Sequence, residues 1–281
     1  MTNKILLCLL ILGACLNPVF GQKNISLEDI WLNYSYYSKS VPGFNFMNDG
    51  ESYSRLQSNK VQKYSIKSGQ FIEDLFALDM LPSSKDLPQS ISGYSFSADE
   101  QKMLVESGPE SIYRYSYKAD YFVWANGSLD PLFDEGKVMH AAFDPSGTRV
   151  AFVFDNNLYI KNLKDGNVDQ VTTDGAFNEV INGSADWVYE EEFGFTKAFQ
   201  WSTDGKYVAY YRFDERAVKE FTMTVYKNEM YPEYQTFKYP KVGEQNATVS
   251  VFIYNVDSKT NIQADLPVDP ELYTPRIKWA N

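Results

Sequence analysis

The sequence predicts an all-β protein of the β-propeller type that is preceded by a short helical segment. From about residue 45 onward, short runs of alternating apolar and polar residues are interrupted by turn residues about every ten positions. A hairpin-sized pattern also recurs along the chain, and 21 Tyr, 19 Phe and 5 Trp supply large side chains for packing between sheets. A β-sandwich whose turns coincide by chance is the alternative architecture.

The first 21 residues read as an export signal. Lys4 supplies a positive charge, and Ile5–Leu16 forms an apolar run that is too short to span a bilayer. Two outcomes are open for this segment: cleavage after Gly21, or lipidation of Cys15, which ends the lipoprotein-like sequence Leu12–Cys15. Either one predicts an exported protein, periplasmic or extracellular, with a lipid anchor only in the second case.

Composition restricts the classes of partner and cofactor. Both cysteines, Cys8 and Cys15, lie in the predicted signal, so the mature chain has neither a disulfide framework nor a CxxC metal site. A formal net charge of −11 argues against nucleic acid and anionic lipid as partners, and it suits a cationic ligand. No sequence motif indicates a metal or another cofactor, and none is expected.

Residues 22–45 are predicted to form a separate N-terminal segment. Ser26-Leu27-Glu28-Asp29 has the pattern of a helix capping box, in which a serine side chain accepts from a backbone N–H three residues later. We therefore expect a short helix that continues through Ile30 and Trp31.

Residues 46–281 are predicted to form the propeller. Each copy of the repeat contains an aromatic residue, a polar turn that ends in Gly or an acid, a basic residue, and an apolar strand. The copies are Gly93–Val105, Ala142–Phe152 and Gln200–Tyr210, and a fourth begins at Ile277–Ala280. Asn126-Gly127 and Asp165-Gly166 predict further hairpins inside the blades. Four-stranded blades around an axis account for this pattern most simply.

The densest signal for function is Asp186–Phe193, in which three consecutive glutamates lie between aromatic residues. Crowded carboxylates in a partly dry environment cost free energy unless a cation offsets them. A substrate ammonium group offers a full charge and three donors, which two carboxylates can accept. The alternative is a solvated acidic helix start that is stabilised by the helix dipole.

The sequence resembles the dipeptidyl peptidase IV branch of the prolyl oligopeptidase clan. Asp186–Glu192 reads DWVYEEE, which is the signature of that branch, and Trp201–Tyr210 and Tyr239–Gly243 follow at the expected distances. The resemblance extends from about Ser26 to Asn281. It implies an eight-bladed β-propeller, of which this chain would hold about half, with an arm at about residues 215–256 that contributes to a homodimer.

The resemblance also implies roles for three side chains. By position, Glu191 and Glu192 would bind the free N-terminal amine of a peptide, whereas the family gives Glu190 no comparable role. Arg114, within Tyr113–Tyr117, would contact the carbonyl oxygen of the second substrate residue, although a tyrosine replaces the tryptophan of the family there. The implied activity is a serine exopeptidase that releases N-terminal X-Pro or X-Ala dipeptides from peptide substrates.

Catalytic residues are not expected within these 281 residues. No G-x-S-x-G nucleophile motif occurs, and the only histidine, His140, has no motif around it and is predicted to be structural. The resemblance implies that the α/β-hydrolase domain with its Ser, Asp and His lies beyond residue 281. We therefore expect this chain alone to be an inactive fragment; a non-catalytic propeller that binds peptides or proteins is the alternative function.

Overall fold

The computed structural model describes residues 24–81, 87–269 and 271–280, so the predicted signal segment, with Cys15, lies outside the described residues. The chain divides into two compact units, Met1–Pro42 and Gly43–Asn281. Within the described ranges, no helix is both long enough and apolar enough to cross a membrane.

The first unit contains the predicted short helix, α2 (Leu27–Trp31). Ser26 is its N-cap, and the Ser26 hydroxyl accepts a hydrogen bond from the Asp29 backbone N–H at 3.0 Å. This bond satisfies one of the N–H groups that lack a partner in the first turn of any helix. The capping prediction is confirmed.

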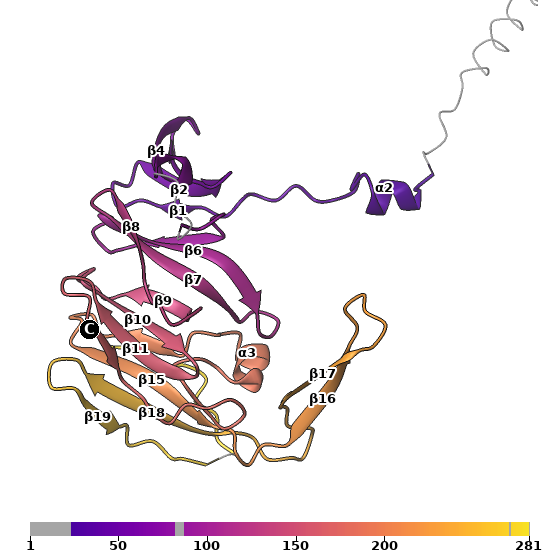
Figure 1. The fold of residues 1–281 in the computed structure, drawn as a ribbon, viewed down its shortest axis with the longest axis vertical. Helices are drawn as coiled ribbons and strands as arrows, with labels where there is room; N and C mark the ends of the chain where they lie inside the picture. Colours follow the sequence, from indigo (N-terminus) through magenta and orange to yellow (C-terminus); the bar gives the residue numbers. More distant parts are fainter. Residues whose placement is uncertain (1–23, 82–86, 270, 281) are drawn as a thin grey trace, which may run out of the picture. The chain divides into compact units, whose positions relative to one another are not determined.

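The described residues of the second unit form four antiparallel sheets and a two-stranded hairpin (Figure 1). The strands of the first sheet are β1 (Asn45–Phe46), β2 (Ser52–Gln57), β3 (Lys60–Ser65) and β4 (Phe71–Ala77), followed by the 3₁₀ turn η1 (Leu78–Met80). Those of the second are β5 (Gly93–Phe96), β6 (Lys102–Ser111), β7 (Tyr117–Ala125) and β8 (Ser128–Pro131). Those of the third are β9 (Met139–Phe143), β10 (Arg149–Phe154), β11 (Asn157–Asn162) and β12 (Val168–Gln170).

The fourth sheet has a split edge strand. Its strands are β13 (Val180–Asn182), β14 (Phe199–Trp201), β15 (Tyr207–Asp214), β18 (Thr248–Asn255) and β19 (Thr260–Gln263). Both β13 and β14 pair with β15, at opposite ends of that strand. Helix α3 (Trp187–Phe193) lies in the segment between them. The acidic signature is therefore an insertion into the first strand of the fourth sheet.

Alternating side chains bind neighbouring sheets together. On β6, Met103 and Val105 join the core shared with the first sheet, whereas Leu104 joins the core shared with the third. On β10, Phe152 faces the second sheet and Val153 faces the fourth. Because successive strand residues point to opposite faces, each central strand contributes to two cores. Four-stranded sheets packed face to face in sequence order are consistent with a portion of a propeller.

The repeated turn has a specific structural cause. In the first three copies, the residue after the aromatic is buried and accepts a hydrogen bond from the backbone N–H five positions later. Ser97 accepts from Lys102 at 3.0 Å, and Ser202 accepts from the residue 207 N–H at 2.9 Å. Asp144 accepts from Arg149 at 2.8 Å. The repeat therefore marks a side-chain bond that closes the turn between the first two strands of a sheet.

The fourth copy behaves differently from the expectation. Ile277–Ala280 forms no strand. The Trp279 indole N–H nevertheless donates to the carbonyl of Gln200 at 3.2 Å, just as Trp201 donates to the carbonyl of Ala142 at 3.3 Å. The aromatic residue of this copy thus makes the same contact with the preceding sheet, although no partner strand pairs with its backbone in the described part of the chain.

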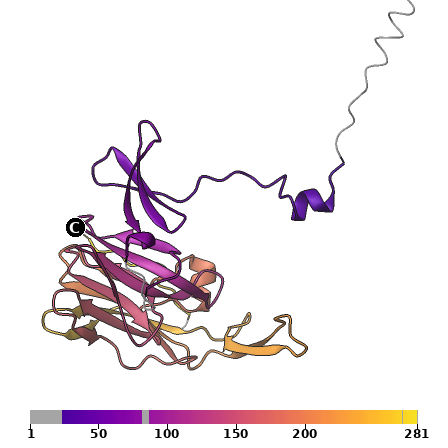
Figure 2. The same ribbon diagram turned by 45° about the horizontal axis from the view of Figure 1, so that its top comes forward.

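The expected arm is shorter than about residues 215–256. Strand β18 (Thr248–Asn255) pairs with β15 along its whole length and buries Val249, Val251 and Tyr254, so it is part of the sheet. The arm proper is the hairpin of β16 (Glu220–Val225) and β17 (Glu233–Lys238). Figures 1 and 2 both show this hairpin extending away from the sheets of its unit.

Candidate functional site

Helix α3 is defined at both ends by its sequence. At the N-terminus, the Asp186 carboxylate accepts from the Tyr189 N–H at 2.8 Å. At the C-terminus, Gly194 adopts the left-handed conformation (φ 69°) that commonly ends helices. Within the helix, Val188 and Tyr189 are buried against the fourth sheet, and the Tyr189 ring contacts Phe213 with a centroid distance of 4.9 Å. The aspartate and the aromatic residues of the signature therefore fix the helix in place.

The three glutamates have three different environments. Glu190 has no exposed surface, the Glu191 side chain is 15% exposed, and Glu192 is an exposed residue. Glu191 and Glu192 lie in the C-terminal half of this seven-residue helix, where the helix dipole disfavours negative charge. The helix dipole therefore does not stabilise this pair. Glu192 is solvated, whereas the largely buried Glu191 needs a nearby cation to offset its charge.

Arg114 supplies such a cation. It lies in the turn of the long β6–β7 hairpin, and its Nε is 3.3 Å from Glu191 Oε1. The Arg114 side chain is 67% exposed, so it borders the acidic pair from the solvent side. For Glu192, no ion pair or side-chain hydrogen bond is found among the described residues. The structure thus brings Arg114 and Glu191 into contact and leaves the Glu192 carboxylate available to a ligand.

Glu190, which is fully buried, also contacts the turn of the β6–β7 hairpin. Its Oε1 accepts from the backbone N–H groups of Tyr115 and Ser116, at 2.7 and 3.0 Å. No role for Glu190 follows from the sequence pattern, because the partners are backbone groups that have no sequence signature. The only available signal is that a third acid in a largely aromatic segment must be either solvated or hydrogen-bonded.

The base of the arm packs against both segments of the site. The Tyr113 ring lies 5.7 Å from the ring of Phe237, and the Trp187 ring lies 4.4 Å from that of Tyr239. Phe237 and Tyr239 are at the end of β17 and just beyond it. The hairpin turn, α3 and the arm base therefore form one packed unit around the acidic pair.

Two buried acids, Asp186 and Glu215, lie close to this packed unit. Burial raises the pKa of Asp186 to about 7 and that of Glu215 to about 8. The negative charge of Asp186 raises the pKa of Glu215 further, whereas Lys238 opposes the shift. Burial also raises the pKa of Tyr113, with contributions from the nearby acids. Near neutral pH, Glu215 is therefore mainly protonated in the folded protein.

We expect Glu215 to make the stability of the protein depend on pH. Glu215 ionises near pH 4.5 in the unfolded chain and near pH 8 in the folded protein. Its contribution to stability is complete at low pH and is lost as the pH rises through about 8. Between about pH 6 and pH 9, the unfolding free energy should fall about 2 to 3 kcal/mol more in the wild type than in Glu215→Gln. Urea unfolding at both pH values measures this difference, with the exposed Glu244→Gln as control; equal slopes in wild type and Glu215→Gln would contradict it.

His140 is placed as a structural residue. It lies on β9, where the pairing with β10 is irregular, and its Nε2 is 3.1 Å from the hydroxyl of Ser184. Burial lowers its pKa to about 3, so the ring is neutral at physiological pH. Its described contacts are with the segment that leads into α3, and they support the fold of this region.

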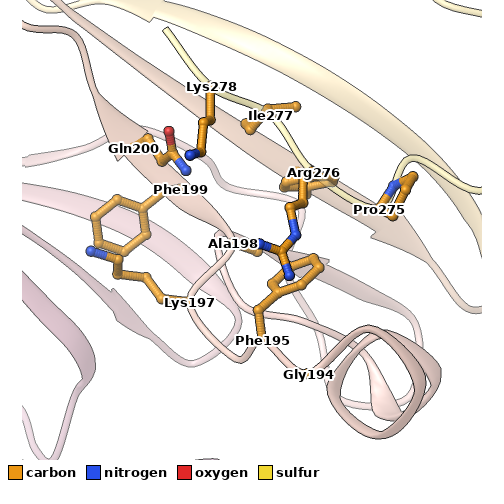
Figure 3. Close-up of a pocket in the computed structure, with 11 residues that line it drawn as sticks. Gly194, Phe195, Lys197, Ala198, Phe199, Gln200, Pro275, Arg276, Ile277 and Lys278 are labelled. Atoms are coloured by element: carbon orange, nitrogen blue, oxygen red, sulfur yellow. The ribbon is translucent and has the colours of Figure 1, made fainter.

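A cavity beside the end of α3 does not suit an amine. Its volume is about 200 Å³, and it lies between Gly194–Gln200 and Pro275–Lys278. Figure 3 shows the cationic side chains of Lys197, Arg276 and Lys278 around it. Neither Glu191 nor Glu192 lines this cavity, and its three cations would repel an ammonium group. Within the described ranges, no group of three or more His, Cys, Asp or Glu side chains could hold a metal ion.

Comparisons with known proteins identify the family. The family described as "Dipeptidyl peptidase IV (DPP IV) N-terminal region" matches residues 97–281. Human prolyl endopeptidase FAP is 31% identical over 237 residues, which cover 82% of this chain and 30% of that protein. A probable dipeptidyl-aminopeptidase B from Talaromyces stipitatus is 36% identical over 202 residues, which cover 64% of this chain and 22% of that protein.

Solved structures agree with this assignment. The crystal structure of Porphyromonas gingivalis dipeptidyl peptidase 4 matches 91% of this chain and 37% of its own, with a TM-score of 0.83 and 39% identity. A putative dipeptidyl aminopeptidase IV from Bacteroides ovatus matches 83% of this chain and 31% of its own, with a TM-score of 0.54 and 18% identity, and shows similarity of fold alone. The chain spans less than a third of the length of the two curated relatives. It belongs to the dipeptidyl peptidase IV family, as part of the region that lies N-terminal in that family.

Proposed function

We propose that this chain is the substrate-anchoring part of an exported serine exopeptidase that releases N-terminal X-Pro or X-Ala dipeptides. Glu191 and Glu192 bind the free amine of the peptide, and Arg114 binds the carbonyl oxygen of its second residue. The observation that carries the proposal is the contact of Arg114 with Glu191 at 3.3 Å, on a helix half where the dipole does not stabilise acids. The names of the relatives, which include dipeptidyl peptidases, support the same activity.

The chemistry of the site accounts for exopeptidase selectivity. An ammonium group donates three charge-assisted hydrogen bonds, and carboxylates on adjacent residues can accept two of them. When no substrate is bound, Arg114 offsets the negative charge of Glu191. Its exposed guanidinium can also donate a hydrogen bond to a substrate carbonyl. Fixing the amine at one depth places the bond after the second residue at a constant distance, so the site measures substrate length. The nucleophile would come from a hydrolase domain, because no G-x-S-x-G motif occurs in these 281 residues.

The test compares free and blocked substrates. In the full-length enzyme, a Gly-Pro reporter with a free N-terminus should be cleaved, whereas its acetylated form should be nearly inert, because acetylation removes the charge that the glutamates bind. Measurement of kcat/KM for both reporters checks this expectation. Equal turnover of the two would contradict the proposal, and binding of the free peptide without cleavage would favour a non-catalytic binding module.

We further propose that the full-length protein is a homodimer and that the arm forms part of the contact. Several large apolar side chains near the arm tip are highly exposed, which is an aggregation hazard unless a partner covers them. These residues are Tyr226 (77% exposed), Met230 (88%), Tyr231 (80%) and Tyr234 (72%).

Replacing the tip residues Tyr226, Met230 and Tyr231 together by serine should therefore yield a monomer. The change leaves Phe237 and Tyr239 intact, because these residues pack against the candidate site. Size-exclusion chromatography with light scattering gives the mass of each form. A triple variant that remains dimeric would exclude the arm tip from the contact.

A further inference from the structure

Only some of the backbone N–H groups in the turn of the β6–β7 hairpin form hydrogen bonds within the turn. The Ile112 N–H donates to the Ser116 carbonyl at 2.8 Å, and the Tyr113 N–H donates to the Ser116 hydroxyl at 3.3 Å. The N–H groups of Tyr115 and Ser116 instead donate to the Glu190 carboxylate on α3, the helix inserted in the fourth sheet. The turn that carries Arg114 therefore depends on α3 for its hydrogen bonds.

Glu190 makes this connection at a considerable energetic cost. Its side chain has no exposed surface, and its Oε2 has no hydrogen-bond partner among the described residues. A buried carboxylate is strongly disfavoured unless hydrogen bonds offset the loss of water. The two backbone N–H groups on Oε1 supply such bonds, and each is a charge-assisted bond within a dry environment. Glu190 is thus committed to holding the turn rather than to binding a ligand from solvent.

The ion pair of Arg114 cannot hold the turn by itself. The Arg114 side chain is 67% exposed, and its contact with Glu191 is a single pairing at 3.3 Å. Exposed ion pairs of this kind contribute about 0 to 1 kcal/mol, because water screens them and the long side chain loses entropy. The position of the Arg114 backbone must therefore come from its neighbours, and Glu190 bonds the next two residues.

We propose that Glu190 is a positioning residue that sets the spacing between Arg114 and the Glu191–Glu192 pair. It joins a turn of the second sheet to the helix inserted in the fourth, and so fixes the width of the site that receives the amine and the carbonyl of the substrate. This inference rests on the proposed function. It gives the first acid of the signature a role distinct from that of the other two.

The test is a double-mutant cycle in the full-length enzyme, with Glu190→Gln and Arg114→Met made singly and together. Gln keeps the shape of Glu but accepts weaker, neutral hydrogen bonds. Glu190→Gln should lower kcat/KM for a Gly-Pro reporter about tenfold, mainly through KM, because substrate binding loses a correctly placed Arg114. In the Arg114→Met background, the same change should cost less than about twofold, since the group that Glu190 positions is gone.

Asp186→Asn is the matched control, since it also converts a buried acid of the same segment to its amide. Any loss it causes should be the same with and without Arg114→Met, because Asp186 caps the helix rather than holding the turn. A Glu190→Gln loss of equal size in both backgrounds would overturn the inference, as would no loss at all. If Glu190→Gln does not yield folded enzyme, the cycle is run with Glu190→Asp, which retains the charge but is one methylene shorter, and the same outcomes decide.

The reporters with free and acetylated N-termini separate this inference from the proposed function. If the wild type cleaves both equally, the amine-binding function fails whatever Glu190 does. If the wild type requires the free amine and the cycle is additive, the function stands and only the positioning role of Glu190 fails.

Discussion

Replacing Glu191 or Glu192 by Gln in the full-length enzyme is expected to lower kcat/KM for a Gly-Pro reporter about 30- to 1000-fold, equivalent to about 2 to 4 kcal/mol of transition-state binding. Each glutamine keeps the volume of the side chain but removes one of the two charges that we propose bind the substrate amine. The folded structure should change little, because neither carboxylate contributes to the buried core. Steady-state kinetics with circular dichroism as a check on folding measures both effects.

The two substitutions should differ in a direction that the structure specifies. Glu191 is only 15% exposed and contacts Arg114, so Glu191→Gln also releases the guanidinium from the ion pair that it forms among the described residues. Glu192 is exposed and has no such contact among the described side chains, so Glu192→Gln removes only a proposed ligand for the amine. We therefore expect the larger loss for Glu191→Gln. The exposed Glu244→Gln serves as control, and near wild-type kcat/KM for both site variants would contradict the assignment.

The succession of similar sheets was predictable because a local hydrogen bond requires the same kind of residue in each copy of the repeat. The side-chain bond from Ser97, Asp144 or Ser202 to a backbone N–H needs a particular residue at a particular spacing, and this is what makes the copies recognisable. Strand β1 and its turn are less conspicuous, because Glu51 and Ser52 follow Asp49-Gly50 where the other copies have a basic residue. The extent of the fourth sheet could not be predicted: β18 has the same aromatic and β-branched composition as the arm, and only pairing with β15 distinguishes it.

Of the candidate site, the sequence predicted only the residues proposed to contact a ligand, Glu191, Glu192 and Arg114. The crowding of Glu191 and Glu192 is visible as composition, and the resemblance to a family selected Arg114 from a distant segment. The role of Glu190 depends on burial and on backbone partners 74 and 75 residues away, and the raised pKa of Glu215 depends on burial and on neighbouring charges. A linear pattern encodes neither. Sequence therefore indicates which groups carry charge, whereas the fold decides which of those charges are buried.

Residues 22–281 produced alone are expected to show no hydrolysis of a Gly-Pro or Ala-Pro reporter at any pH and to self-associate. The sequence has no nucleophile motif, so the proposed amine site would hold a peptide without cleaving it. Self-association is expected at the fourth sheet, where every residue of the edge strand β19 is exposed and Ile262 is 66% exposed. An unprotected edge strand with an apolar side chain offers a template for pairing with a second copy.

A charge at that edge should reduce the association. Ile262→Lys places an ammonium group on the exposed strand, and it should shift the 22–281 polypeptide toward monomer in size-exclusion chromatography without restoring activity. The full-length enzyme, assayed in parallel, shows that the reporter is a substrate. A well-behaved monomer of residues 22–281 that cleaves the reporter and is inhibited by a serine-directed phosphonate would contradict the prediction. It would mean that a serine within this sequence is activated without the G-x-S-x-G turn, because only an ionised or base-assisted hydroxyl attacks such a phosphonate at a useful rate.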